Sequence, residues 1–170
     1  MLKESIQNAL NDQIQAEFHS AYLYLSMAAW CEAKNFDGFG HWMRMQAQEE
    51  MFHAMKVYDY VHMTGGQVVL QAVQQPDVDW ADSLALFKAS FDHEQYMTGR
   101  INDLLSLAME ERDHATANML QWFISEQVEE EATVDAIYGK LEMMGDNMHA
   151  IYMLDRELAA RATPTPPAAE

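Results

Sequence analysis

Four long proline-free segments dominate this sequence, and apolar residues recur in each of them at alternating intervals of three and four. The segments cover about residues 5–33, 38–64, 83–111 and 114–144. This alternation is typical of helices that pack at shallow angles in a bundle. We therefore expect an all-α fold built on four long helices.

Residues that favour helix ends lie at the borders of these segments. Asp37, Asp82 and Asp113 occupy positions where an N-cap is expected, because their side chains can accept hydrogen bonds from free backbone N–H groups. The pairs Gly65–Gly66 and Gly145–Asp146 follow the segments that should stop there.

The lengths of the connections predict the topology. Only a few residues join the first helix to the second and the third to the fourth, so each pair should form an antiparallel hairpin. The link at 66–82 can span roughly 56 Å when extended, which exceeds the roughly 40 Å of a helix of about 27 residues. The expected fold is a four-helix bundle with one long crossover, in which 68–70 form a short extended piece and 147–160 form a short fifth helix.

Composition narrows the domain organisation and the classes of partner. We expect one domain over residues 1–162 and a flexible tail at 163–170, which contains three prolines. Cys31 is the only cysteine, so one chain can form neither an internal disulfide nor a cysteine-built metal site. No leader or membrane span is evident, which favours a cytoplasmic protein without a membrane partner. The net charge of -17 disfavours nucleic acid and suits cations, although acidity also simply promotes solubility.

Each apolar stripe is interrupted near its middle by polar residues. Buried carboxylates need counter-charge, and the central part of each stripe contains no lysine or arginine. Metal ions are the remaining source of positive charge, and carboxylates with one imidazole suit iron or manganese. The alternative is a polar core layer whose groups satisfy one another. The interrupting residues are Glu17, Glu50, His53, Glu94, Gln127 and Glu130.

Glu50 and His53 are three residues apart and so project from one face of their helix. This Glu-x-x-His spacing is an element of di-iron bundles. The spacing alone is weak evidence, since Glu111 and His114 share it at an expected helix end. The position at mid-stripe distinguishes Glu50 and His53.

Three stretches of sequence resemble the first, second and fourth helices of bacterial and archaeal non-haem ferritins. They are residues 15–25 (QAEFHSAYLYL), 48–56 (QEEMFHAMK) and 121–131 (QWFISEQVEEE). The resemblance extends over nearly the whole chain. It implies a ferritin-like bundle that oxidises Fe(II) to Fe(III) with dioxygen or peroxide and stores ferric oxide-hydroxide inside a homo-oligomeric shell, commonly of 24 subunits.

The resemblance also implies roles for individual residues. One iron would be held by Glu17, Glu50 and His53, and a second by Glu94 and the bridging Glu50. Gln127 would form a hydrogen bond near the pair of irons, and Tyr24 would lie close to them. A plain core tyrosine is the alternative for Tyr24.

A third, looser iron site is implied by the same resemblance. For Glu126 and Glu129, a solvated acidic face is the alternative interpretation. The residues implied in this site are Glu49, Glu126, Glu129 and Glu130.

Two related classes of protein share this type of bundle. Bacterioferritins ligate haem through methionine, but methionine is an ordinary filler of helical cores, and we expect no haem despite 14 methionines. The fourth helix also lacks the second Glu-x-x-His that bacterioferritins and many di-iron oxygenases carry. This favours a ferritin-type site from which iron moves into a mineral core. A di-iron enzyme that acts on an organic substrate remains the competing hypothesis.

Overall fold

The computed structural model describes residues 2–166 and is all-α. The five helices are α1 (Glu4–Ala33), α2 (Asp37–Met63), α3 (Ser83–Glu110), α4 (His114–Met144) and α5 (Met148–Leu158). Within the described residues there is no strand. The predicted four long helices and the short fifth helix are thereby confirmed. The segment at 68–70, expected to be extended, forms no strand.

The caps explain where the helices begin. Asp82 accepts a hydrogen bond from the N–H of Ala85, and Asp113 accepts one from the N–H of Thr116. The prediction for Asp37 was wrong: Phe36 is the N-cap, without a side-chain bond, and Asp37 is the first helical residue. An acidic side chain there still interacts favourably with the positive end of the helix dipole.

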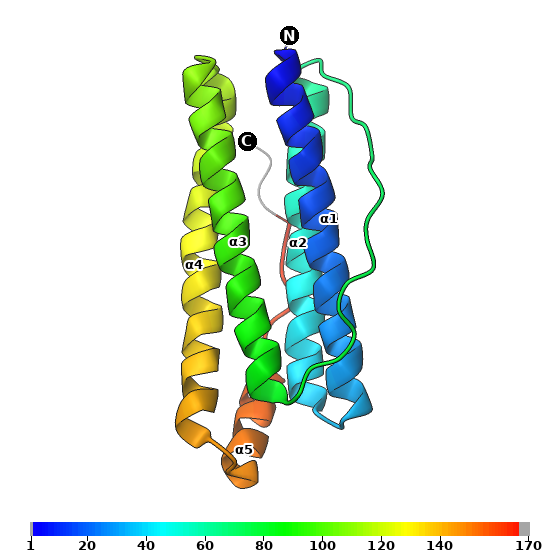
Figure 1. Ribbon diagram of the computed structural model, residues 1–170, viewed down its shortest axis with the longest axis vertical. Coiled ribbons are helices and arrows are strands. Elements are labelled where there is room, and N and C mark those ends of the chain that lie inside the picture. Colours follow the sequence, from blue (N-terminus) through cyan, green and yellow to red (C-terminus); the bar gives the residue numbers. More distant parts are fainter. Residues whose placement is uncertain (1, 167–170) are drawn as a thin grey trace.

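Helices α1 and α2 form one antiparallel hairpin, and α3 and α4 form the other (Figure 1). The crossover between α2 and α3 runs beside α1 along the length of the bundle, as Figure 1 shows. Side chains of α1 hold it in place. Asn11 Nδ2 donates to the carbonyl of Gln67 over 3.0 Å, and Ser26 Oγ donates to the carbonyl of Asp77 over 2.6 Å. The predicted crossover is confirmed.

The apolar core consists of two separate clusters. One contains Met27, Phe39 and Phe87 near the end where α5 lies, and the other contains Val57 and Phe123 toward the opposite end. The polar mid-stripe residues lie between the two clusters. A well-packed core on both sides holds this polar layer in place and keeps water away from it.

Helix α5 docks on the start of α2 through a close backbone approach. A Cβ atom at Gly38 would lie 1.7 Å from the carbonyl oxygen of Asp155. The buried Asp155 carboxylate also accepts a hydrogen bond from the N–H of Phe39 over 2.8 Å. Only glycine at position 38 allows this contact.

We expect Gly38→Ala to detach α5 and lower the free energy of unfolding by about 1–3 kcal/mol, the usual cost of overpacking. Urea unfolding measures this change. Gly99→Ala is the matched control, because a Cβ there meets nothing within 4 Å. Alanine at an open helical position stabilises by about 0.5–1 kcal/mol. Equal stability of the two variants would contradict the docking contact.

None of the helices described between residues 2 and 166 has the length and apolar character required to cross a membrane. Residues 163–166 lack regular structure, and 167–170 lie outside the described residues. The flexible tail over 163–170 therefore stays a prediction.

Candidate metal centre

Side chains from all four long helices converge in the polar layer between the two core clusters. Glu17 comes from α1, Glu50 and His53 from α2, Glu94 from α3 and Glu130 from α4. Each of them except Glu130 has at most 4% of its surface exposed. A buried group of four carboxylates and one imidazole is the arrangement that metal ions stabilise.

The ligand atoms form two groups that share one residue. Oxygen or nitrogen atoms of Glu17, Glu50 and His53 lie within 4.8 Å of one another, and the same holds for Glu50, Glu94 and Glu130. Glu50 belongs to both groups, so its two oxygens can bridge two neighbouring cations. The geometry permits the bridging role that the resemblance implies for Glu50, and that role stays a prediction.

Glu130 lies in the second of these groups. The resemblance implies a place in the looser third site, whereas the structure brings one Glu130 carboxylate oxygen close to Glu50 and Glu94. Its Oε2 atom is buried and has no hydrogen-bond partner. Since an unpaired buried carboxylate oxygen is costly, this atom is a natural ligand for a cation.

Glutamine amides support the carboxylates. Gln13 Nε2 donates to Glu17 Oε1 over 2.7 Å. Gln46 Nε2 donates to Glu50 Oε1 over 3.1 Å and to Glu130 Oε1 over 3.0 Å. Neither role was predicted, although each glutamine precedes its glutamate by one helical turn, and that spacing could have indicated the contact.

Two predicted neighbours of the centre also contact Glu94. Gln127 Nε2 donates to Glu94 Oε2 over 3.4 Å, as expected for this residue. The hydroxyl of Tyr24, which is fully buried, donates to Glu94 Oε1. Tyr24 is therefore attached to the candidate site and is more than a packing residue.

Electrostatics favour neutral carboxyls when no metal is bound. Burial and the negative charge of Glu50 raise the pKa of Glu17 and of Glu94 to about 8. Burial likewise raises the pKa of Glu130 well above its usual value. Three of the candidate ligands thus hold protons at neutral pH, because their negative charges cannot be buried together.

Glu50 and His53 behave in the opposite way. Burial opposes charge on Glu50, but hydrogen bonding and the charge of His53 outweigh it and lower the pKa of Glu50. Burial also disfavours the charged form of His53, yet the bond to Glu50 and nearby carboxylates raise the pKa of His53 well above its usual value. His53 Nδ1 lies 3.4 Å from Glu50 Oε2, so the metal-free centre contains an ion pair.

Metal binding is therefore expected to release protons, because Glu17, Glu94 and His53 must lose them to act as ligands. Adding redox-inactive Zn²⁺ to metal-free protein at about pH 7 in a pH-stat should release more than one proton per chain. Glu94→Gln removes one of these protons and should reduce the release. Binding of Zn²⁺ without proton release would contradict this assignment.

The other three residues of the implied third site do not all lie together. Glu126 is half-buried and lines a cavity of about 550 Å³ together with Glu49 and His53. Glu129 is exposed on α4 and is not among the residues that line this cavity. Glu49 forms an ion pair with Arg161, a residue that follows α5. The structure thus brings Glu49 and Glu126 to one cavity but not Glu129.

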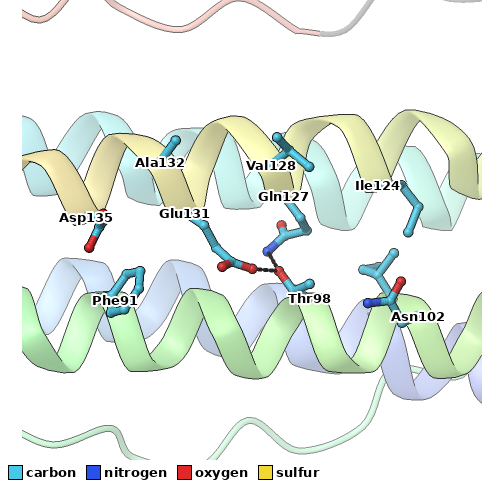
Figure 2. A pocket seen from close by; sticks show the side chains of 10 residues that line it. Phe91, Thr98, Asn102, Ile124, Gln127, Val128, Glu131, Ala132 and Asp135 are labelled. Carbon is cyan, nitrogen blue, oxygen red and sulfur yellow. Dashed lines mark hydrogen bonds between the residues drawn. The ribbon is translucent and has the colours of Figure 1, made fainter.

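A groove between α3 and α4 lies beside the centre and is separated from it by Gln127 (Figure 2). Its volume is about 510 Å³, and Thr98, Gln127 and Glu131 line it. Thr98 donates to Glu131 and lies 3.3 Å from Gln127 Nε2, as Figure 2 shows. Gln127 thereby connects the groove to Glu94. Thr98 was not among the predicted site residues.

The fold and the site together define the class of protein. A four-helix bundle with one long crossover, in which buried carboxylates and a histidine can hold two adjacent cations, is the arrangement typical of di-metal carboxylate proteins. A model of the ferritin-like domain matches residues 7–144. The chain belongs to the ferritin family.

Individual relatives agree with this membership. The chain is 38% identical over 161 residues to a bacterial non-heme ferritin of Staphylococcus aureus (strain USA300), covering 95% of this chain and 97% of the relative. Among solved structures, an open pore ferritin from the hyperthermophilic archaeon Archaeoglobus fulgidus matches with a TM-score of 0.94 and 47% identity, covering 95% of this chain and 99% of that chain. An engineered closed form of that ferritin matches with a TM-score of 0.95 and 46% identity.

Proposed function

We propose that this protein oxidises Fe(II) and stores the ferric product. The single observation that carries the proposal is the shared Glu50, which joins the two ligand groups and can hold two cations side by side. Ferritin family membership supplies iron as the cation. Oxygen donors with one imidazole suit iron in both oxidation states, and hard anionic ligands favour Fe(III).

The chemistry follows from the residues that surround the two positions. Two Fe(II) ions bind as substrate, one at Glu17, Glu50 and His53 and the other at Glu50, Glu94 and Glu130, displacing the protons described above. Each gives up one electron, so the pair of ions reduces one dioxygen and two protons to hydrogen peroxide, or one hydrogen peroxide and two protons to two waters. Water that then binds Fe(III) loses protons, and ferric oxide-hydroxide results. The buried surroundings limit access of other reactants.

A third iron site is part of the proposal. Glu49 and Glu126 share a cavity with His53, so a cation there would lie next to the di-iron centre. Glu130 would take part less directly, since it is close to Glu50 and Glu94. Glu129 is the weakest member, because its exposed side chain fits the solvated-face interpretation.

Storage requires a container, and one bundle encloses no space of that size. We therefore propose a homo-oligomeric shell of 24 subunits, in line with the family and with ferritin structures as neighbours. Helix α5 would then lie at a symmetry axis. We propose the cytoplasm as the compartment, because reducing conditions there maintain Fe(II).

The test is to load the assembled protein with Fe(II) under anaerobic conditions, admit air, and measure both particle size and iron retained per chain. A large soluble particle that retains many irons per chain is the expected result. A small particle that retains about two irons per chain would instead indicate a dedicated di-iron enzyme. The same experiment thus separates storage from the competing hypothesis.

A further inference from the structure

The segment that follows α5 turns back along α2 toward the middle of the bundle (Figure 1). Arg161 anchors it there. Its Nη2 atom donates to Gln46 Oε1 over 2.9 Å and pairs with the Glu49 carboxylate. Its Nη1 atom donates to the carbonyl of Trp42 over 3.1 Å, and the guanidinium carbon lies 4.4 Å from the centre of the Trp42 ring.

This segment lines the cavity of about 550 Å³ that adjoins the candidate metal centre. Residues 161–166 form one wall, and Glu49, His53 and Glu126 contribute to the others. His53 also belongs to the first ligand group. The cavity is therefore the space into which a cation would move from His53 toward Glu49, and the C-terminal segment forms one side of it.

The guanidinium of Arg161 competes with a metal ion for this position. A guanidinium only donates hydrogen bonds and keeps its charge at every accessible pH. Arg161 is four-fifths buried at its side chain, so its charge is only partly screened. A divalent cation at Glu49 would lie beside a fixed positive charge and would also lose a carboxylate oxygen to it.

We propose that Arg161 acts as a latch. It holds the C-terminal segment against the cavity, and a third divalent cation binds at Glu49 only after the Arg161–Glu49 ion pair breaks. The inference rests on the third site of the proposed function. It adds that Arg161 and the segment 161–166 control whether that site can be filled.

The same residue also connects the latch to the di-metal ligands. Because Arg161 can only donate, it fixes the amide of Gln46 with Oε1 toward itself and Nε2 toward Glu50 and Glu130. Release of Arg161 frees this amide to turn. Filling of the third site is thereby coupled to the hydrogen bonds at Glu50 and Glu130.

The test measures Zn²⁺ binding to the metal-free, assembled protein by titration calorimetry. Arg161→Gln should strengthen the weaker class of Zn²⁺ sites, beyond the di-metal centre, by about tenfold, the amount expected for loss of one charged hydrogen bond. Arg161→Lys keeps the charge and should stay close to the parent protein. Arg156→Gln on exposed α5 surface is the matched control and should change nothing.

A second readout separates the latch from a general structural role. The N–H groups of residues 159–161 donate to carbonyls of α5. Their hydrogen exchange should be slow in the metal-free parent, become fast when Zn²⁺ fills the weaker class, and be fast in Arg161→Gln without Zn²⁺. Adding Glu49→Gln to Arg161→Gln should abolish the weaker class, which locates it.

Equal Zn²⁺ affinity of the weaker class in the parent and in Arg161→Gln, or absence of that class from both, would overturn the latch. Slow exchange of the N–H groups of residues 159–161 at saturating Zn²⁺ would do so as well. Failure of the proposed function is a separate result: the parent protein would then not oxidise Fe(II), whatever the Zn²⁺ titrations show.

Discussion

Glu50→Ala is expected to slow the initial oxidation of Fe(II) by about 100-fold or more, because the change removes a ligand from both metal positions at once. Loss of a group that only supports a ligand already costs about 10–100-fold. The measurement is stopped-flow absorbance of the ferric product after mixing Fe(II) protein with air-saturated buffer. His53→Ala affects one position only and should cause a smaller loss.

Glu110→Ala is the matched control, since Glu110 is an exposed glutamate at the end of α3, far along the chain from either ligand group. Circular dichroism should show the same helix content in all variants, since the two core clusters remain intact. Fast oxidation by Glu50→Ala at the parent rate would refute the bridging assignment and, with it, the paired site.

The metal-free protein is expected to lose stability as the pH rises from about 5 to about 9. The pKa of Glu17 and of Glu94 is about 8 in the folded chain, against a usual value of 4.5. Between those values the folded chain binds more protons than the unfolded chain, so raising the pH favours unfolding. The raised pKa of His53 acts in the same direction, because its stabilisation is lost as pH rises through the folded value.

Glu17→Gln removes one of the buried groups that must ionise. At about pH 9 in the presence of a chelator, its apparent Tm should exceed that of the parent by several degrees, since 1 kcal/mol corresponds to about 2–4 °C at this chain length. At about pH 5 the two proteins should unfold alike. Thermal scans followed by circular dichroism provide the measurement.

Glu110→Gln, which changes an exposed glutamate, should follow the parent at both pH values. With saturating Zn²⁺, the apparent Tm of the parent should instead rise with pH, because at high pH fewer protons compete with the metal for the ligands. A parent protein whose apparent Tm is constant between about pH 5 and 9 without metal would show that these carboxyls ionise freely. The polar layer would then not be a strained, metal-requiring site.

These two predictions describe one trade-off. The carboxylates that reduce the stability of the empty protein are the ones that bind iron, so a more stable metal-free variant should be a poorer ferroxidase. Glu17→Gln is expected to show both effects. The loss of stability is confined to the metal-free protein, since bound cations supply the missing positive charge.

Much of the fold could be predicted because helix periodicity is local. The repeat of three and four, the aspartates at positions 82 and 113 and the short connections depend on residues close in sequence, and the structure confirms them. The prediction that Asp37 is an N-cap was wrong for a local reason as well, since the helix begins one residue earlier and its N-cap is Phe36. A cap depends on backbone angles that residue type only biases.

The depth that the candidate ligands share could be predicted, because polar residues in the middle of apolar stripes lie at one level in a bundle of helices of similar length. Glu17, Glu50, His53 and Glu94 indeed lie together in the structure. The stripe pattern placed Glu130 in this layer as well, whereas the resemblance implied the third site for it. Neighbouring glutamates on α4 differ by about 100° around the helix, and packing decides which of them turns inward. Only the tertiary structure also shows which glutamine donates a hydrogen bond to which carboxylate.

The sequence by itself determined the helices, their order and the depth at which acidic groups are buried, since these follow from spacing along one chain. Only the tertiary structure decided that Arg161 contacts Glu49 and Gln46, that the C-terminal segment forms a wall of the cavity beside His53, and that Glu130 lies close to Glu50. Those contacts join residues more than 75 positions apart. Their free energies depend on how whole helices and the chain after α5 pack, which no local pattern records.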